Sequence, residues 1–179
     1  MNNSQEPEDH SKKNDYRTIE QTMEKLAGGT RRLAAQLTTS ASFDSLWNVL
    51  TDYDRLNLYI PNLLSSKKIY QKDNNVHLNQ VGAQDFLGMK FSAEVTINLF
   101  EDKKLGLLKF NLIKGDFRRF EGSWKIQNIK DTSKNSLIYD LTVQGCQWMP
   151  IGMIEKRLKR DLSENLIAVD RQAKSSINN

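Results

Sequence analysis

The chain has 179 residues and a formal net charge of +4, with 38% hydrophobic and 27% charged residues. This balance predicts a soluble globular domain large enough to bury a core. No stretch approaches the ~20 consecutive apolar residues of a membrane-spanning helix, and the first 28 residues lack the apolar centre of a secretory signal. The single cysteine, Cys146, excludes an internal disulfide and fits a reducing compartment. We therefore expect a cytoplasmic protein, with peripheral association at a membrane as an open alternative.

The two ends of the chain are polar. Residues 1–28 carry four basic and six acidic side chains, which leaves a charge of +6 on the rest of the chain. We expect this segment to be a disordered tail, with at most a weak helix over residues 16–27. Residues 29–172 form the expected domain, and residues 173–179 form a polar C-terminal tail.

The first elements of the domain are a strand and two short helices. Alternating apolar residues predict a strand over residues 30–39. Ser42, followed by Asp44 and Ser45, predicts a helix N-terminus, and that helix should end near Asp52. A second short helix is expected over residues 53–59, before Pro61 stops it.

In the middle of the chain, apolar and polar residues alternate with a period of two, which is typical of strands with one buried face. The clearest strand is 89–100, where Phe91, Ala93, Val95, Ile97 and Leu99 share one face. A hairpin is expected near residues 69–81, with its turn at 73–75. Further strands are expected over 105–114, 118–129 and 137–143.

The last element is a long helix. Its apolar residues recur at spacings of three and four: Ile151, Ile154, Leu158, Leu162, Leu166 and Val169. This helix is the large apolar partner available to a one-sided sheet. The order of elements therefore predicts an α+β fold, in which a curved antiparallel sheet of about seven strands wraps around the C-terminal helix. Such a sheet leaves a cleft beside the helix.

Four stretches carry a resemblance to a known family. They are FDSLWNVLTDYDRLNLYIPN (43–62), VGAQDFLGMKFSAEV (81–95), GDFRRFEGSW (115–124) and YDLTVQGCQWMPIGMIEKRLKRDLSENL (139–166). The sequence resembles the START-like superfamily, also called helix-grip or SRPBCC, and within it the polyketide cyclase/dehydrase and coenzyme Q-binding group. The resemblance implies an internal apolar cavity for a lipid, quinone, polyketide or pigment. It implies neither a shared catalytic set nor a cofactor.

The predicted ligand-cavity residues come from the sheet and the last helix. They are Phe91, Phe110, Arg118, Phe120, Trp124, Tyr139, Leu141, Met153, Ile154 and Leu158. If Phe120 faces inward, strand alternation sends Arg118 the same way, where it would suit a quinone carbonyl or an acidic head group. The alternative for Arg118 is a salt bridge at the rim, and the alternative for the aromatic residues is ordinary core packing.

A second predicted set forms a lid or a membrane contact: Leu56, Tyr59, Ile60, Trp148 and Met149. The apolar run 148–153 precedes the basic residues Lys156, Arg157, Lys159 and Arg160. This pattern fits transient contact with an anionic membrane surface. It equally fits a helix start that is tucked into the core and has a solvated basic face.

No catalytic or metal-binding signature is present. His10 and His77 are interpreted as surface residues, Cys146 as a packing residue, and Asp52 and Asp54 as helix caps. The leading hypothesis is a carrier or chaperone for a quinone, isoprenoid, lipid or pigment, without a cofactor. One alternative is an aromatase/cyclase, with Arg118, Tyr139 or Asp116 moving protons. Another is a ribosome-associated interaction protein, although no aromatic-plus-basic RNA module supports a nucleic-acid partner.

Overall fold

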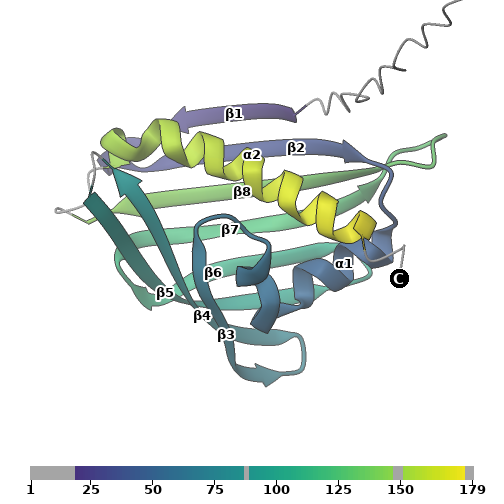
Figure 1. Ribbon diagram of the computed structural model, residues 1–179, viewed down its shortest axis with the longest axis horizontal. Helices are drawn as coiled ribbons and strands as arrows, with labels where there is room; N and C mark the ends of the chain where they lie inside the picture. Colours follow the sequence, from purple (N-terminus) through teal and green to yellow (C-terminus); the bar gives the residue numbers. More distant parts are fainter. Residues whose placement is uncertain (1–18, 87–88, 147–150, 176–179) are drawn as a thin grey trace, which may run out of the picture.

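The structure is a computed structural model that describes residues 19–86, 89–146 and 151–175, with the backbone alone at 84–86, 89–91 and 151–154. In this part of the chain, eight strands form one antiparallel sheet in the order β1-β2-β8-β7-β6-β5-β4-β3. Helix α2 (Ile151–Ser175) crosses one face of that sheet (Figure 1). The strands are β1 (Ile19–Lys25), β2 (Arg31–Thr39), β3 (Leu63–Lys72), β4 (Asn75–Phe86), β5 (Met89–Asp102), β6 (Leu107–Gly115), β7 (Phe117–Asn128) and β8 (Asn135–Gly145). The α+β helix-grip fold is thereby confirmed, with one strand more than predicted.

The additional strand is β1, in a segment that the sequence assigned to a disordered tail with a weak helix. Residues 19–25 pair antiparallel with β2 along their whole length, from Ile19 opposite Leu37 to Lys25 opposite Arg31. Ile19 and Met23 are half-buried against the core, while the residues between them are exposed. The domain therefore begins at least ten residues earlier than predicted, because β2 offers a free edge that a polar, weakly alternating segment can cover.

The two short helices lie where the sequence placed them. Helix α1 (Phe43–Thr51) begins at Ser42, whose Oγ accepts a hydrogen bond from the Ser45 N–H at 3.1 Å. The 3₁₀ helix η2 (Tyr53–Leu58) follows and ends before Pro61. Asp52 closes α1, whereas Asp54 accepts a hydrogen bond from the Lys68 N–H at 2.8 Å. Both carboxylates therefore have local structural contacts.

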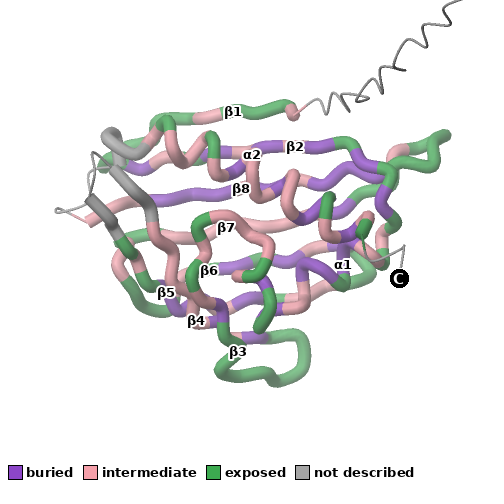
Figure 2. The backbone as a smooth tube through the Cα atoms, in the orientation of Figure 1, coloured by how far each residue is buried: buried purple, intermediate pink, exposed green. Residues whose placement is uncertain are grey.

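The core lies between the sheet and the two α-helices. Every second residue of β8, from Leu137 to Val143, is buried, and α2 contributes Leu162, Leu166, Val169 and Ala173. Figure 2 shows buried residues along β2 and β8, whereas the β3–β4 turn is exposed. The predicted apolar stripe of the last helix is therefore confirmed at its described side chains.

Polar contacts fasten one flank of α2 to β1 and β2. The Arg31 Nε donates to Glu155 Oε2 at 3.0 Å, and Gln21 Nε2 donates to the Lys159 carbonyl at 2.6 Å. Near its C-terminal end, the buried carboxylate of Asp170 accepts a hydrogen bond from the Thr39 hydroxyl. Helix α2 continues to Ser175, so residues 173–175 belong to the helix and not to the predicted polar tail.

None of the helices in the described part of the chain combines the length and the apolar character needed to cross a bilayer.

Candidate functional site

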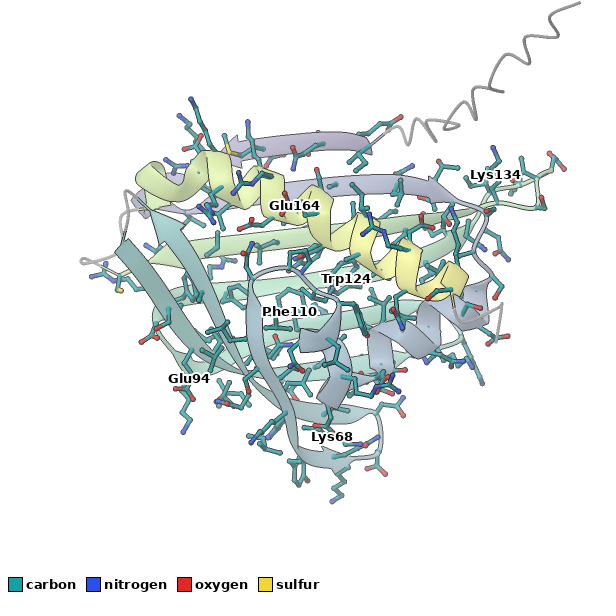
Figure 3. All side chains as sticks on the ribbon, in the orientation of Figure 1. Lys68, Glu94, Phe110, Trp124, Lys134 and Glu164 are labelled. Atoms are coloured by element: carbon teal, nitrogen blue, oxygen red, sulfur yellow. The ribbon has the colours of Figure 1, made fainter. Side chains whose placement is uncertain are left out.

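Five aromatic side chains form a continuous surface on the face of the sheet that α2 crosses. This aromatic wall consists of Phe110, Phe117, Phe120, Trp124 and Tyr139. Trp124 stacks on Tyr139 with ring centroids 4.0 Å apart and an interplanar angle of 9°. Phe110 lies 5.6 Å from Phe120 and 6.4 Å from Tyr139, in tilted geometry. Figure 3 shows Phe110 and Trp124 toward the middle of the molecule, with Lys68 and Glu94 toward its edge.

Strand register explains why these rings meet. Trp124 is paired with Tyr139 across β7 and β8, and Phe110 is paired with Gly122 across β6 and β7. Gly122 lies between Phe120 and Trp124 on the same face of β7, because side chains two apart share a face. Since Gly122 has no side chain, the ring of Phe110 occupies the space above it.

The wall is only partly covered. Phe110 and Tyr139 are buried, but Phe117, Phe120 and Trp124 are half-buried although they pack against the core. Two other predicted cavity residues have side chains in the same region: Leu141 is buried in β8, and Leu158 of α2 is half-buried. The interior therefore presents apolar surface that the described side chains do not fully enclose.

The inward placement predicted for Arg118 is wrong. The pairing of β7 with β8 shifts register between Phe117 and Arg119, so that Arg118 is the extra residue of a β-bulge and has no partner in β8. The bulge brings Phe117 onto the same face as Phe120, with ring centroids 5.3 Å apart. Arg118 is exposed, and the ion pair at this rim joins Arg119 to Glu121.

The residues considered for proton transfer are not brought together. Asp116 and Arg118 lie at the β6–β7 turn, whereas Tyr139 is paired with Trp124, six residues beyond Arg118 and roughly 20 Å farther along β7. Asp116 Oδ2 accepts a hydrogen bond from the Glu94 N–H at 2.7 Å, and its carbonyl accepts one from Cys146 Sγ at 3.2 Å. These contacts stabilise the turn.

Burial also sets the chemistry of Tyr139. The loss of solvent raises the pKa of its hydroxyl well above the ordinary value, and the nearby carboxylate of Asp161 raises it further. Tyr139 is therefore a neutral hydrogen-bond donor at physiological pH.

Helix α2 supplies a polar stripe that the sequence interpretation missed. Arg157, Asp161 and Asn165 recur at intervals of four residues and are half-buried, whereas Lys156 and Arg160 are exposed. The sequence had grouped Arg157 with a solvated or membrane-facing basic surface. The spacing was visible in the sequence, but only packing distinguishes the inner flank of a helix from its outer one.

The segment predicted as a lid is anchored at several points. Leu56 is buried in the core, so it is not available to a membrane. The Tyr59 hydroxyl donates to the Val49 carbonyl of α1 at 2.6 Å, and Ile60 is half-buried. Asn62, which has a left-handed φ of 62°, donates from Nδ2 to Asp161 Oδ1 of α2 at 3.3 Å.

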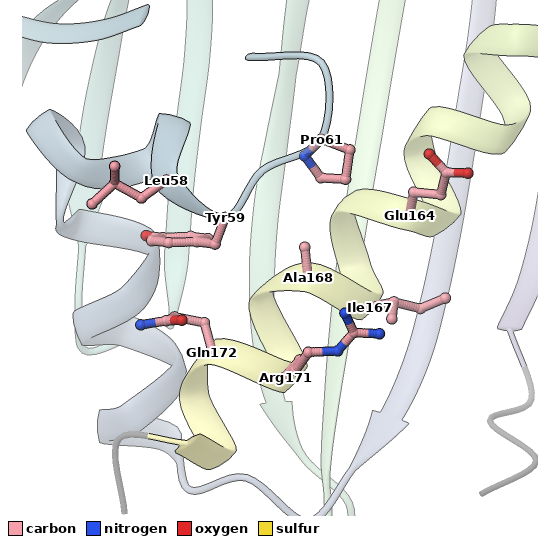
Figure 4. A pocket seen from close by; sticks show the side chains of 8 residues that line it. All are labelled: Leu58, Tyr59, Pro61, Glu164, Ile167, Ala168, Arg171 and Gln172. Carbon is pink, nitrogen blue, oxygen red and sulfur yellow. The ribbon is translucent and has the colours of Figure 1, made fainter. Parts of the chain in front are cut away.

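A groove of about 490 Å³ separates this segment from α2. We call it the η2 groove; it is lined by Leu58, Tyr59, Pro61, Glu164, Ile167, Ala168, Arg171 and Gln172 (Figure 4). Tyr59 and Pro61 lie on one side, and Ala168 and Gln172 face them from the helix. The groove is thus a described opening on the flank of α2 that carries the polar stripe.

Several predicted residues lie outside the described side chains: Phe91, Met153 and Ile154 of the cavity set, and Trp148 and Met149 of the lid set. His10 lies outside the described residues as well, while the ring of His77 contacts Tyr70 at 4.8 Å. Among the described residues, no group of three His, Cys, Asp or Glu side chains is placed to hold a metal ion.

Comparison with solved structures finds the same fold at low sequence identity. The Zhui aromatase/cyclase from Streptomyces sp. R1128 is 15% identical with a TM-score of 0.70, covering 83% of this chain and 96% of its own. The STAR-related lipid transfer protein from Xanthomonas axonopodis is 13% identical with a TM-score of 0.74, covering 87% and 93%. Human StAR-related lipid transfer protein 5 is 7% identical with a TM-score of 0.70, covering 88% and 82%.

No curated protein sequence matches significantly. The family model described as polyketide cyclase / dehydrase and lipid transport matches residues 39–170, which run from the end of β2 almost to the end of α2. The chain therefore belongs to the polyketide cyclase / dehydrase and lipid transport family, as the resemblance of its sequence implied.

Proposed function

We propose that this protein binds an apolar small molecule between the sheet and α2 and acts as its carrier. The observation that carries the proposal is the half-exposed aromatic wall. A folded domain normally covers Phe and Trp side chains on its inner face, since burying such a side chain contributes about 1.5–3 kcal/mol. Phe117, Phe120 and Trp124 retain exposed area there, which a bound ligand would cover.

The family and the structural relatives support this reading of the wall. Two of the relatives described above are lipid transfer proteins by name, and the family description includes lipid transport. A quinone, an isoprenoid, a lipid or a pigment would each present apolar surface to the aromatic rings. Stacking on the half-buried ring of Trp124 would favour a ligand with a planar or conjugated part.

The η2 groove is the access route that we infer. It opens between the Tyr59–Pro61 segment and α2, and the Asn62–Asp161 hydrogen bond lies close to it on the same helix flank. Leu58 and Leu64 flank Pro61 and are 69% and 62% exposed. Contact with an anionic membrane stays a prediction. Among the described residues, Leu58 and Leu64 are the side chains of this segment that we expect to make that contact.

The test is to purify the full chain without detergent, record native mass spectra and identify any extracted ligand. The same protein is then offered decylubiquinone, farnesol, oleic acid and protoporphyrin, with uptake followed through tryptophan fluorescence. Trp124→Ala should weaken uptake, whereas Tyr70→Ala, which removes an exposed aromatic side chain of β3, should not. A protein that arrives empty and takes up no member of the panel would contradict the proposal.

Aromatase/cyclase activity is the second candidate, favoured by the family description and by the fold shared with the Zhui enzyme. Of the three residues first considered for proton transfer, Tyr139 alone lies on the aromatic wall. The wild-type protein should therefore cyclise a polyketide-like substrate, and the Tyr139→Phe variant should not. Turnover that survives this substitution would remove Tyr139 from the chemistry.

A further inference from the structure

The polar stripe of α2 (Arg157, Asp161 and Asn165) is half-buried and lies on the flank of the helix away from the one that is fixed to the sheet edge. Contacts to β1 and β2 come from Glu155, Lys159 and Asp170. Arg157, Asp161 and Asn165 lie on the other flank, because residues four apart stack along one side of a helix. Asn62 reaches Asp161 from the segment opposite that flank.

Two further contacts locate the stripe. Helix α2 packs against β8, the strand that carries Tyr139, and the Asp161 carboxylate lies near enough to the Tyr139 hydroxyl to raise its pKa. The Asp161 part of the stripe is therefore near Tyr139. Toward the C-terminus, Ala168 and Gln172 continue the same flank and line the η2 groove (Figure 4). The stripe thus lies between the opening and the apolar wall.

Asn165 contributes an enclosed hydrogen-bond acceptor to this stripe. The Oδ1 of Asn165 is enclosed, and no described residue donates a hydrogen bond to it. An enclosed acceptor without a donor destabilises the fold because it has lost its hydrogen bonds to water, and native proteins keep few such groups. A ligand that brings a hydrogen-bond donor would satisfy it.

The charges on the stripe restrict the kind of group that fits. The Asp161 carboxylate disfavours an anionic head such as a carboxylate or phosphate, and Arg157 disfavours a cationic one. A neutral hydroxyl can donate to Asn165 Oδ1 and also accept from the Tyr139 hydroxyl. We propose that Asp161, Asn165 and Tyr139 form a hydrogen-bonding subsite for a hydroxyl group on an otherwise apolar ligand.

This subsite rests on the proposed ligand-binding function, so the experiment must distinguish a failure of the subsite from a failure of that function. Binding of three naphthalene compounds of similar shape to the full chain is compared at pH 7. The compounds are 2-naphthol, 2-methoxynaphthalene and naphthalene. Affinity is measured by calorimetry and by quenching of tryptophan fluorescence. The wild-type protein should bind 2-naphthol about tenfold more tightly than the methoxy compound, which accepts but cannot donate, since one buried hydrogen bond contributes roughly that factor.

Asn165→Leu should abolish this preference while leaving the affinity for naphthalene unchanged. Asn48→Leu is the matched control, because Asn48 is an exposed asparagine of helix α1, and it should keep the preference. Asp161→Asn should raise the affinity for 2-naphthoate, which the wild-type protein should bind weakly. Retained naphthalene binding shows that each variant is folded.

Equal binding of 2-naphthol and 2-methoxynaphthalene to the wild-type protein would overturn the subsite alone. A preference that survives Asn165→Leu would do the same, as would tight binding of 2-naphthoate to the wild-type protein. Failure of all three neutral probes to bind would overturn the subsite, and the proposed function would be overturned with it only if the protein also takes up no member of the quinone, isoprenoid, fatty-acid and porphyrin panel.

Discussion

Gly122 shows how a missing side chain shapes the binding face. A Cβ at this position would lie 2.0 Å from the Asp140 carbonyl oxygen and 2.9 Å from Cζ of Phe110. The first of these contacts is to backbone, which cannot move aside without disturbing the pairing of β7 with β8. The glycine therefore allows both the close approach of β8 and the position of the Phe110 ring.

Gly122→Ala should lower the free energy of unfolding by about 1–3 kcal/mol, the range of an overpacked interior. Gly82→Ala is the control, since a Cβ there makes only an ordinary contact of 3.6 Å with the Asn62 carbonyl oxygen. Urea unfolding of the two variants measures the difference. Equal stabilities would show that β8 relaxes around the added methyl group.

The ion pair between Arg31 and Glu155 joins β2 to the first described turn of α2. Arg31 Nε lies 3.0 Å from Glu155 Oε2, and Lys25 approaches the same carboxylate at 3.7 Å. The hydrogen bond from Arg31 is the main cause of a lowered pKa of the Glu155 carboxyl, and the charge of Lys25 contributes. These contacts connect two strands at the sheet edge to the helix that covers the aromatic wall.

A carboxyl whose pKa is lower in the folded state stabilises the fold above its unfolded pKa of about 4.3. This stabilisation is lost as the pH falls below that value and through the lower folded pKa. The wild-type protein should therefore be more stable than Glu155→Gln at pH 7, and the difference should shrink progressively as the pH falls below about 4.3. Thermal melting as a function of pH checks the sign. A difference that does not change with acidification would point to packing and not to charge.

Strand β1 is a structural part of the domain, because it covers the edge of β2 and contributes Ile19 and Met23 to the core. Deletion of residues 1–28 should cost about 2 kcal/mol of stability, the contribution of two half-buried apolar side chains. Deletion of residues 1–18 retains β1 and serves as the control. Hydrogen exchange should show loss of protection at the β2 amides in the longer deletion alone.

The arrangement of the whole molecule predicts how a ligand enters. The η2 groove lies between a segment anchored at Tyr59 and the flank of α2 that carries Ala168. If the groove is the access route, filling it should slow both association and dissociation, while the equilibrium affinity changes little.

Ala168→Phe should therefore slow uptake and release of 2-naphthol several-fold in stopped-flow fluorescence. Lys156→Phe, at an exposed position of the same helix, is the control and should leave both rates unchanged. Unchanged rates in Ala168→Phe would place the access route elsewhere. A loss of affinity without a change in association rate would instead make the groove part of the binding site.

The sequence by itself determined the class of fold and most of its elements. Period-two patterns in β5, β7 and β8, the Ser42 cap and the apolar stripe of α2 all depend on neighbours along the chain, so local spacing predicts them. Phe110, Phe120, Trp124 and Tyr139 were identified together for the same reason, since each occupies an inward position of its own strand.

Only the tertiary structure decided the remaining features. The bulge that turns Arg118 outward and Phe117 inward is a property of the pairing of β7 with β8, and a single strand read alone carries no signal for it. Strand β1 exists because β2 offers an edge, although its own sequence is largely polar. The polar stripe of Arg157, Asp161 and Asn165 differs from the exposed Lys156 and Arg160 only by which flank the sheet and the Asn62 segment cover. Each of these features depends on contacts between distant segments, which exist only once the chain has folded.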